Sequence, residues 1–228
     1  NKMADLEGNL AFAFYYRGNQ EEAIKYFNRS LTRLGIHDKN ANAAVASQIT
    51  INLLHIILLL YLPLPRGKKI PTYKENRIIN IILAKGHLLA LTDAKSMFAN
   101  TIMGFKECFK FDLSKSQPAL NAVAGGAALF SFTGISFSVG KRSLDYAQKY
   151  LSSNNQQVSP YYFKMFETIH NYLSGTWDCS LGEEYIDYDI KIGETFCAAT
   201  HLLYIGYIYM ERGDFDKTSE ITERLKVI

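Results

Sequence analysis

A single glycine separates two helical runs at several places along this 228-residue chain. Near the N-terminus, the sequence FAFYYRGNQEEAIKYFNRSL places Gly18 between an aromatic-rich run and an amphipathic run. The same arrangement returns around Gly175 and Gly213, and more loosely around Gly140. The interval from Gly140 to Gly175 is 35 residues, and that from Gly175 to Gly213 is 38. Intervals of this size are typical of proteins built from repeated helix–turn–helix units. The glycines therefore predict a stack of helix pairs.

Local physical chemistry explains the parts of each unit. Gly18 lies where the first helix ends, because a residue without a Cβ adopts the left-handed conformation of a helix C-terminus at little cost. Asn19, Thr176 and Asp214 follow three of the glycines, and we expect them to cap the helices that come next. In the first unit, apolar or small residues recur with helical spacing on one face of each run: Leu10, Ala11 and Phe14, then Ala23, Phe27 and Leu31. A small residue such as Ala11 or Gly206 on the first helix is expected to let its partner pack closely.

The middle of the chain, residues 37–115, lacks clear repeats but keeps helical periodicity. It predicts one helix over 41–62, ended by Pro63 and Pro65, a loop over 63–71, and two helices over 73–91 and 92–111 with Thr92 or Asp93 as the cap between them. Sustained alternation of polar and apolar residues, the mark of a strand, is missing. The sequence therefore predicts an all-α fold of about eleven antiparallel helices.

The residues around the glycines resemble the tetratricopeptide repeat pattern. The resemblance rests on Leu10, Ala11, Phe14, Gly18, Ala23, Phe27 and Leu31, and in part on Ile205, Gly206, Tyr209, Gly213, Phe215 and Leu225. It implies a right-handed superhelix forming a single domain over 1–228, with a clear repeat at 1–36, divergent helices at 37–115 and three further repeats at 116–228. The chain departs from the pattern at Thr218 and Thr222, which replace the usual alanine and bulky residue, and at Ala147, which is two positions out of register.

The segments YYRGNQEEAIKYFNRSLTRLG, SGTWDCSLGEEYI and MERGDFDKTSEI further resemble the C-terminal helical repeat region of bacterial multidomain signalling proteins. In those proteins the repeats follow an ATPase module found in transcription activators, Ser/Thr kinase hybrids and adenylate or guanylate cyclases. The resemblance implies a non-catalytic regulatory module of a cytoplasmic signal-transduction protein. Its partner would be a peptide or protein, including upstream domains of its own chain; the alternative is a domain that senses a small inducer molecule. A start inside a helix without an initiator Met also leads us to expect a fragment.

Aromatic residues are abundant, with 15 Tyr and 14 Phe. In a tetratricopeptide array the first helix of each pair lines the concave surface, so alignment on the glycines predicts a set of binding residues. The set is Asn9, Phe12, Tyr15, Tyr16, Phe166, Tyr172, Tyr204, Tyr207 and Met210. Tyrosine suits recognition surfaces because it combines contact area with a polar tip; the alternative is that half of these side chains fill the core. Tetratricopeptide chaperone adaptors use a set of Lys and Asn residues to bind a C-terminal carboxylate. Of this set only Asn9 is present at the aligned positions, so binding of chaperone tails is not expected.

Composition excludes several other classes of function. The net charge of +3, from 25 basic and 22 acidic residues, is too small to predict binding to nucleic acid or to an anionic membrane. The apolar stretch over 49–62 is too short for a membrane span, and the stretch over 119–140 is diluted by polar residues and glycines, so both are expected to be buried helices. Three cysteines without a CxxC motif predict neither disulfides nor zinc, and fit a reducing cytoplasm.

Residues for catalysis or metal binding are sparse. The five histidines stand alone, without an HxxxH or HExxH pair, so no metal and no cofactor are predicted. His170 and His201 are expected to be partly buried helix residues. The acidic segment GEEYIDYD places Glu183 and Asp187 on one helix face, which favours a solvated surface over acid–base catalysis. A helical enzyme using these two carboxylates is the remaining alternative.

Overall fold

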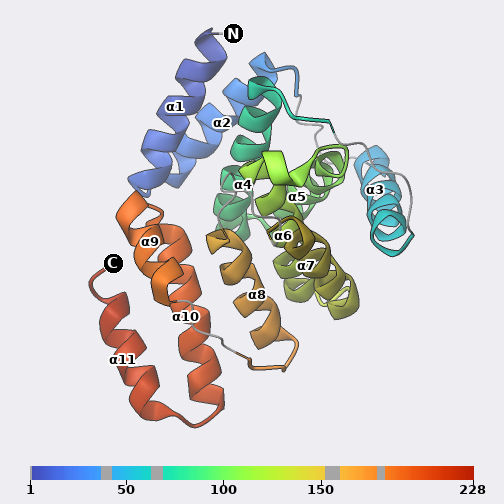
Figure 1. Cartoon of the computed structure of the whole chain (residues 1–228). Helices are drawn as coiled ribbons and strands as arrows, with labels where there is room; N and C mark the ends of the chain where they lie inside the picture. The colour runs from blue at the N-terminus through green and yellow to red at the C-terminus, as the bar shows by residue number, and fades with distance from the viewer. Residues whose placement is uncertain (1, 37–42, 63–68, 152–159, 179–182) are drawn as a thin grey trace. The chain divides into compact units, whose positions relative to one another are not determined.

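The protein is all-helical in the residues that its computed structural model describes, which are 2–36, 43–62, 69–151, 160–178 and 183–228 (Figure 1). These residues form eleven α-helices and contain no β-sheet, only an isolated bridge between Lys69 and Phe111. The helices are α1 (Lys2–Tyr16), α2 (Gln20–Arg33), α3 (Ala43–Tyr61), α4 (Tyr73–Thr92), α5 (Ala94–Cys108), α6 (Gln117–Phe132), α7 (Phe137–Leu151), α8 (Tyr161–Leu173), α9 (Glu183–Ile192), α10 (Thr195–Glu211) and α11 (Phe215–Leu225). The predicted all-α fold is confirmed.

The chain divides into two compact units, Asn1–Ala122 and Val123–Ile228, with the boundary inside α6. The prediction of one continuous repeat domain over 1–228 stays a prediction.

In the first unit, α1 and α2 form a helix hairpin, and α2 packs against α4 (Figure 1). The core between these helices is built from Ala4, Ala11, Ala23, Phe27, Leu31, Leu34, Ile81, Ile82, Ala84 and Leu88. Ala11 is fully buried, as expected of a small residue at a close helix crossing, whereas Leu10 is 39% exposed and does not belong to the core. Helix α5 packs against both α3 and α4.

In the second unit, α10 packs against α8, α9 and α11. Its core is built from Ile186, Ala198, Leu202, Ile205, Tyr209 and Ile221. A Cβ added at Gly206 of α10 would lie 3.2 Å from Ile221 Cγ2 of α11, so this glycine allows the close approach that the sequence predicts. The C-terminal part of α6 packs on α7 and α8: the Ser143 hydroxyl donates to the Val123 carbonyl, and Ser131 Oγ lies 2.8 Å from His170 Nδ1.

The predicted role of the turn glycines is confirmed at three positions. Gly18, Gly175 and Gly213 have φ values of 73°, 74° and 75°. After each of them, the next residue donates its backbone N–H to a carbonyl five residues earlier, which is the Schellman arrangement at a helix C-terminus. Asn19 and Asp214 then cap α2 and α11 by accepting hydrogen bonds from backbone N–H groups, and Asp93 caps α5 in the same way.

Two of the local predictions are wrong. The turn glycine between α6 and α7 is Gly134, with φ 65°, whereas Gly140 lies inside α7. Gly140 is the fourth residue of its helix, as Ala23 is of α2, and a Cβ there would lie 3.2 Å from the Ala127 carbonyl oxygen. Thr176 is not an N-cap, because α9 does not begin until Glu183.

The two apolar stretches, 49–62 and 119–140, differ in how they are folded. Residues 49–61 belong to α3, but Ile51, Leu54 and Leu58 are at least half exposed, so the prediction of a buried helix is wrong for this face of α3. Residues 119–140 are not one helix but the main part of α6, a turn at Gly134 and the start of α7. Among the described residues, no helix combines the length and the apolar character that crossing a bilayer requires.

Candidate binding surface

The predicted binding residues fall into two groups, one in each unit. Asn9, Phe12, Tyr15 and Tyr16 lie on α1 of the first unit, and Phe166, Tyr172, Tyr204, Tyr207 and Met210 lie on α8 and α10 of the second. The two groups are therefore described separately.

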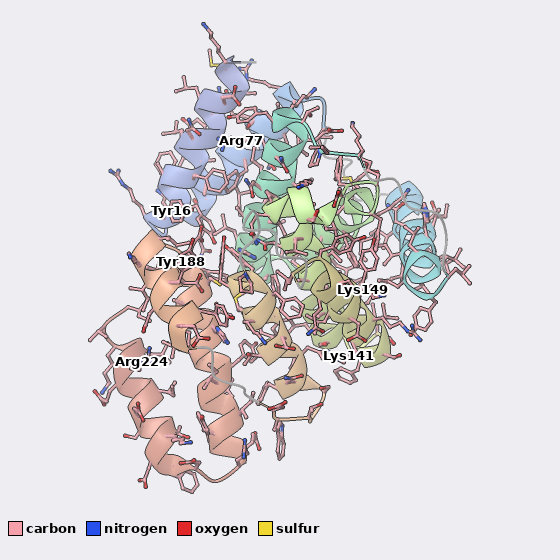
Figure 2. All side chains as sticks on the ribbon, viewed as in Figure 1. Tyr16, Arg77, Lys141, Lys149, Tyr188 and Arg224 are labelled. Atoms are coloured by element: carbon pink, nitrogen blue, oxygen red, sulfur yellow. The ribbon has the colours of Figure 1, made fainter. Side chains whose placement is uncertain are left out.

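On α1, the Arg77 side chain from α4 already occupies the predicted surface (Figure 2). Its guanidinium donates to Asn9 Oδ1 over 2.6 Å and to the Asp5 carbonyl over 3.4 Å. It also lies 5.2 Å from the centre of the Phe12 ring, a cation–π distance. Asn9 and Phe12 thus hold α4 against α1, which is a structural role.

The aromatic rings of α1 pack largely on one another. Phe12 contacts the buried Phe27 edge-on at 5.0 Å and stacks with Tyr16 at 6.3 Å. The Tyr15 hydroxyl lies 3.3 Å from His87 Nδ1 of α4, and burial lowers the pKa of His87 to about 4. Tyr16 is the most exposed of these aromatic rings, at 55%, so it is the one best placed for contact with a partner.

In the second unit, α8 and α10 pack along a seam, and each helix contributes four side chains at helical spacing. The α8 side of the seam is Tyr161, Met165, Thr168 and Tyr172, and the α10 side is Cys197, His201, Tyr204 and Ile208. Their pairing is visible in two contacts, Thr168 with His201 at 3.0 Å and Tyr172 with Tyr204 at 5.6 Å between ring centres. The seam is roughly 16 Å long, since a helix rises about 1.5 Å per residue between Tyr161 and Tyr172.

At the C-terminal end of the seam, three tyrosines form a triangle, which we call the tyrosine cluster: Tyr172, Tyr204 and Tyr207. The ring centres are 5.6, 5.4 and 5.8 Å apart. Burial raises the pKa of the Tyr204 phenol to about 12, and Tyr207 and Tyr172 add to this effect. The ring of Phe132, at the end of α6, lies 6.0 Å from Tyr204 and is 53% exposed. The cluster therefore joins α8 and α10, and Phe132 extends its aromatic contacts to α6.

The remaining two predicted residues of this unit differ in exposure. Met210 is 45% exposed on α10. Phe166 is only 6% exposed and packs against Gly125 of α6 and the ring of Tyr162. Phe166 thus belongs to the interior, because the face of α8 that carries it is covered by α6.

Near the opposite, N-terminal end of the seam lies Asp189, a residue whose burial the sequence pattern does not predict. Asp189 of α9 belongs to the acidic segment for which the sequence predicts a solvated face, yet it is fully buried beside the Cys197 thiol of α10. Burial raises the pKa of Asp189 to about 7; the neighbouring Cys197 thiol opposes this shift, and the charge of Glu194 reinforces it. Asp189 follows the apolar Ile186 by three residues, so both lie on one face of the helix, and Ile186 is also fully buried. This spacing is the one sequence feature that could have indicated the burial of Asp189.

Of the predicted pair Glu183 and Asp187, the structure describes only the side chain of Asp187. Asp187 is exposed and pairs at 3.1 Å with Arg224 of α11, the residue labelled on that helix in Figure 2. The side chain of Glu183 lies outside the described residues. The exposed position of Asp187 fits the predicted solvated surface for this residue, whereas Asp189 of the same segment is buried.

Burial keeps two cysteines and two histidines in their neutral forms. Cys108 and Cys197 are fully buried, and burial raises the pKa of both thiols. His170 and His201 are almost entirely buried, and burial lowers the pKa of each. No group of three His, Cys, Asp or Glu side chains in the described parts of the chain has the geometry to hold a metal ion. Cys179 and His37 lie outside those parts.

Comparison with known proteins adds no relative: no protein-family model, curated protein or solved structure matches the chain.

Proposed function

We propose that this chain is a non-catalytic interaction module whose helix pairs stack as in a tetratricopeptide array. In this proposal the module binds a peptide or protein partner on the surface around the tyrosine cluster. The resemblance to the repeat region of signalling proteins adds a regulatory role. In this role the module has two conformational states that differ in affinity for the partner, and binding of the partner shifts the module towards the tighter-binding state.

The observation that carries the proposal is the tyrosine cluster together with the neighbouring Phe132. Phe132, Tyr172 and Tyr204 come from α6, α8 and α10, which are the first helices of the three predicted C-terminal pairs. In a tetratricopeptide array these are the helices that line the concave surface. Tyr207 and Phe132, at 36% and 53% exposure, offer aromatic area next to phenol groups that donate or accept hydrogen bonds. Such rings are enriched among the residues that dominate binding energy in interfaces.

A displayed library of random 12-residue peptides tests this proposal, because it samples partners of any sequence. The 228-residue chain is used to enrich binding peptides, and their affinities are then measured for the Tyr207→Ala variant. We expect affinity to fall at least tenfold, because removing a central aromatic anchor costs about 1.4 kcal/mol or more. Thermal unfolding should stay close to that of the parent chain, since Tyr207 is partly exposed.

The matched control is Phe215→Ala, which removes a 69% exposed aromatic ring from α11, the second helix of its pair. Peptide affinity should be unchanged in this variant. If Tyr207→Ala and Phe215→Ala bind the enriched peptides equally well, the tyrosine cluster is not the binding surface. If no peptide is enriched and a small metabolite stabilises the chain instead, the alternative of a small-molecule sensor replaces the proposal.

A further inference from the structure

Helix α3 has two roughly opposite faces, and only one of them is covered. Asn52, Ile56 and Leu60 recur every four residues on the first face, and all three are buried. This face packs against α5, where the Lys106 ammonium donates to Asn52 Oδ1 over 3.0 Å. Helix α3 lies at the edge of the first unit (Figure 1), and its second face is exposed.

The second face carries a continuous apolar row, which we call the α3 stripe: Ile51, Leu54, Leu58 and Leu62. These residues follow one another by three, four and four positions, so they lie on one side of the helix. The first three are 50–58% exposed, and Leu62 is 44% exposed. At a rise of about 1.5 Å per residue the stripe is roughly 17 Å long. Single exposed leucines are normal, but a contiguous apolar row of this kind is typical of an interaction surface.

The composition of α3 supports the same conclusion. From Ala43 to Tyr61 the helix contains no Asp, Glu, Lys or Arg. A helix at the surface of a protein normally turns a charged or polar face to water, whereas a helix that is apolar all round is covered on all sides. The α3 stripe therefore indicates a face that a partner covers.

The area of the stripe is close to what association of two copies requires. Its four side chains, with Tyr61 beside them at 42% exposure, present roughly 400–500 Å² of accessible surface. The partly exposed Leu53 and Ile57 extend this surface along its edges. Two copies that cover each other's stripes therefore remove about 1,000 Å² from water, which is the lower limit for a specific interface. This area fits a reversible dimer better than a permanent one.

Charge and symmetry favour a second copy over other occupants. A stripe without charges cannot select a charged peptide, and helices that bind membrane surfaces carry basic residues on their polar face, which α3 lacks. A second copy supplies an equally apolar row of the same length. Antiparallel pairing about a two-fold axis brings Leu54 of one copy beside Leu58 of the other. The same pairing brings Ile51 beside Leu62, so each apolar side chain meets another.

We infer that α3 forms the interface of a homodimer, in which the α3 stripes of two copies pack antiparallel about a two-fold axis. The inference goes beyond the proposed function and does not depend on it, because the α3 stripe belongs to the first unit and the tyrosine cluster to the second.

The test is sedimentation equilibrium of the 228-residue chain over a range of concentrations. We expect the average mass to rise with concentration from that of one chain towards that of two. An interface of this size should give a dissociation constant on the order of 10 µM, so concentrations from about 1 to 300 µM cover the transition.

Two charge substitutions test the stripe and the pairing. Leu54→Glu places a carboxylate in the middle of the interface, so the dissociation constant should rise by about tenfold or more, and Leu58→Lys should have the same effect. Both positions are exposed in the single chain, so the melting temperature at low concentration should stay near that of the parent. A mixture of the two variants should associate again, because antiparallel pairing brings the introduced carboxylate beside the introduced ammonium group.

Leu6→Glu is the matched control, since it makes the same change at a 62% exposed leucine of α1 and should leave the dimer unaffected. Tyr207→Ala should also dimerise as the parent chain does. This second control distinguishes failure of the dimer interface from failure of the peptide surface.

Several results would overturn the inference. One is a chain that stays monomeric at every concentration, and another is a dimer that persists in Leu54→Glu and Leu58→Lys. If a monomeric chain binds phosphatidylcholine vesicles and Leu54→Glu does not, a membrane surface is the occupant instead. If selected peptides lose affinity for Leu54→Glu but not for Tyr207→Ala, the occupant is another protein. A parent dimer with no association in the mixture of variants would contradict the antiparallel pairing.

Discussion

The Nε2 atom of His201 on α10 lies 3.0 Å from the Thr168 hydroxyl oxygen on α8, and both side chains are buried. The Thr168 hydroxyl also lies 3.0 Å from the Lys164 carbonyl oxygen. Because a hydroxyl has a single proton to donate, it donates to Lys164 and accepts from the Nε2–H of His201. The other ring nitrogen, Nδ1, has no partner among the described residues. This contact fixes the neutral imidazole in the middle of the α8–α10 seam.

Thr168→Val should destabilise the protein by about 1–3 kcal/mol, because it leaves a buried N–H of His201 without an acceptor. Chemical denaturation at pH 7 gives this difference in the free energy of unfolding. Thr222→Val is the matched control, since the exposed Thr222 hydroxyl bonds only to a carbonyl of its own helix, and it should change stability by less than about 0.5 kcal/mol. Equal effects of the two substitutions would show that the Thr168–His201 contact is not stabilising.

Stability should fall as the pH drops from about 6.5 towards 4. Burial lowers the pKa of His87 and His201 to about 4 in the folded chain, so between these values the unfolded chain binds more protons. Asp189 acts in the opposite sense: its pKa of about 7 means that the folded chain binds an extra proton between about pH 4 and 7. Asp189→Asn should therefore steepen the loss of stability on acidification by up to about 1.4 kcal/mol per pH unit. Parallel pH profiles for the two proteins would mean that Asp189 ionises normally in the folded state.

Arg77→Lys should lower the free energy of unfolding by about 1 kcal/mol. A lysine ammonium cannot reproduce both the contact with Asn9 and the position over the Phe12 ring, because only the planar guanidinium does both. Asn9→Ala removes one of the same contacts, so the two substitutions should be less than additive in a double-mutant cycle. Full additivity would indicate that Arg77 acts independently of Asn9.

Gly104→Ala should be destabilising by about 1–3 kcal/mol, since its Cβ would lie 2.6 Å from Ile82 Cγ2 of α4. Ile82→Ala is destabilising by itself, but its effect and that of Gly104→Ala should be less than additive in the double variant, because the clashing methyl group is then absent. Gly86→Ala is the control within α4: its Cβ meets only Thr101 Oγ1 at 3.4 Å and Asn100 Nδ2 at 3.7 Å, so better helix propensity should make it neutral or stabilising. Thermal unfolding of the four proteins checks these signs.

Gly213→Ala tests the turn conformation rather than packing. The glycine has φ 75° and no atom within 4 Å of an added Cβ, so only backbone strain opposes the substitution. The expected cost is about 1–2 kcal/mol, and Gly213→Asn should cost less because asparagine tolerates the left-handed region better. A cost for asparagine equal to that for alanine would speak against this explanation.

The local features of the fold followed from the sequence. Gly18, Gly175 and Gly213 end helices, and Asn19 and Asp214 cap the next ones, because these conformations depend on the residue itself and its near neighbours. The helix pattern also separated α4 from α5 at Asp93. The sequence predicts the turn at Gly140 because this glycine fits the repeat interval to Gly175 better than Gly134 does. Only packing against Ala127 and His170 shows that Gly140 is a helix interior residue.

The candidate sites depended on contacts that the sequence does not encode locally. Periodicity marks the faces of a helix but not which neighbour covers each face. Thus α6 buries Phe166 although it shares α8 with the partly exposed Tyr172, and Arg77 of α4 occupies the surface of α1 around Asn9. By sequence alone Asp189 is one of several acidic residues in a segment predicted to be solvated, whereas in the structure it is buried against α8 and α10. The sequence determined the helices and their turns, because those are short-range properties; only the tertiary structure decided which polar and aromatic groups are buried together, because burial is set by residues far apart in the chain.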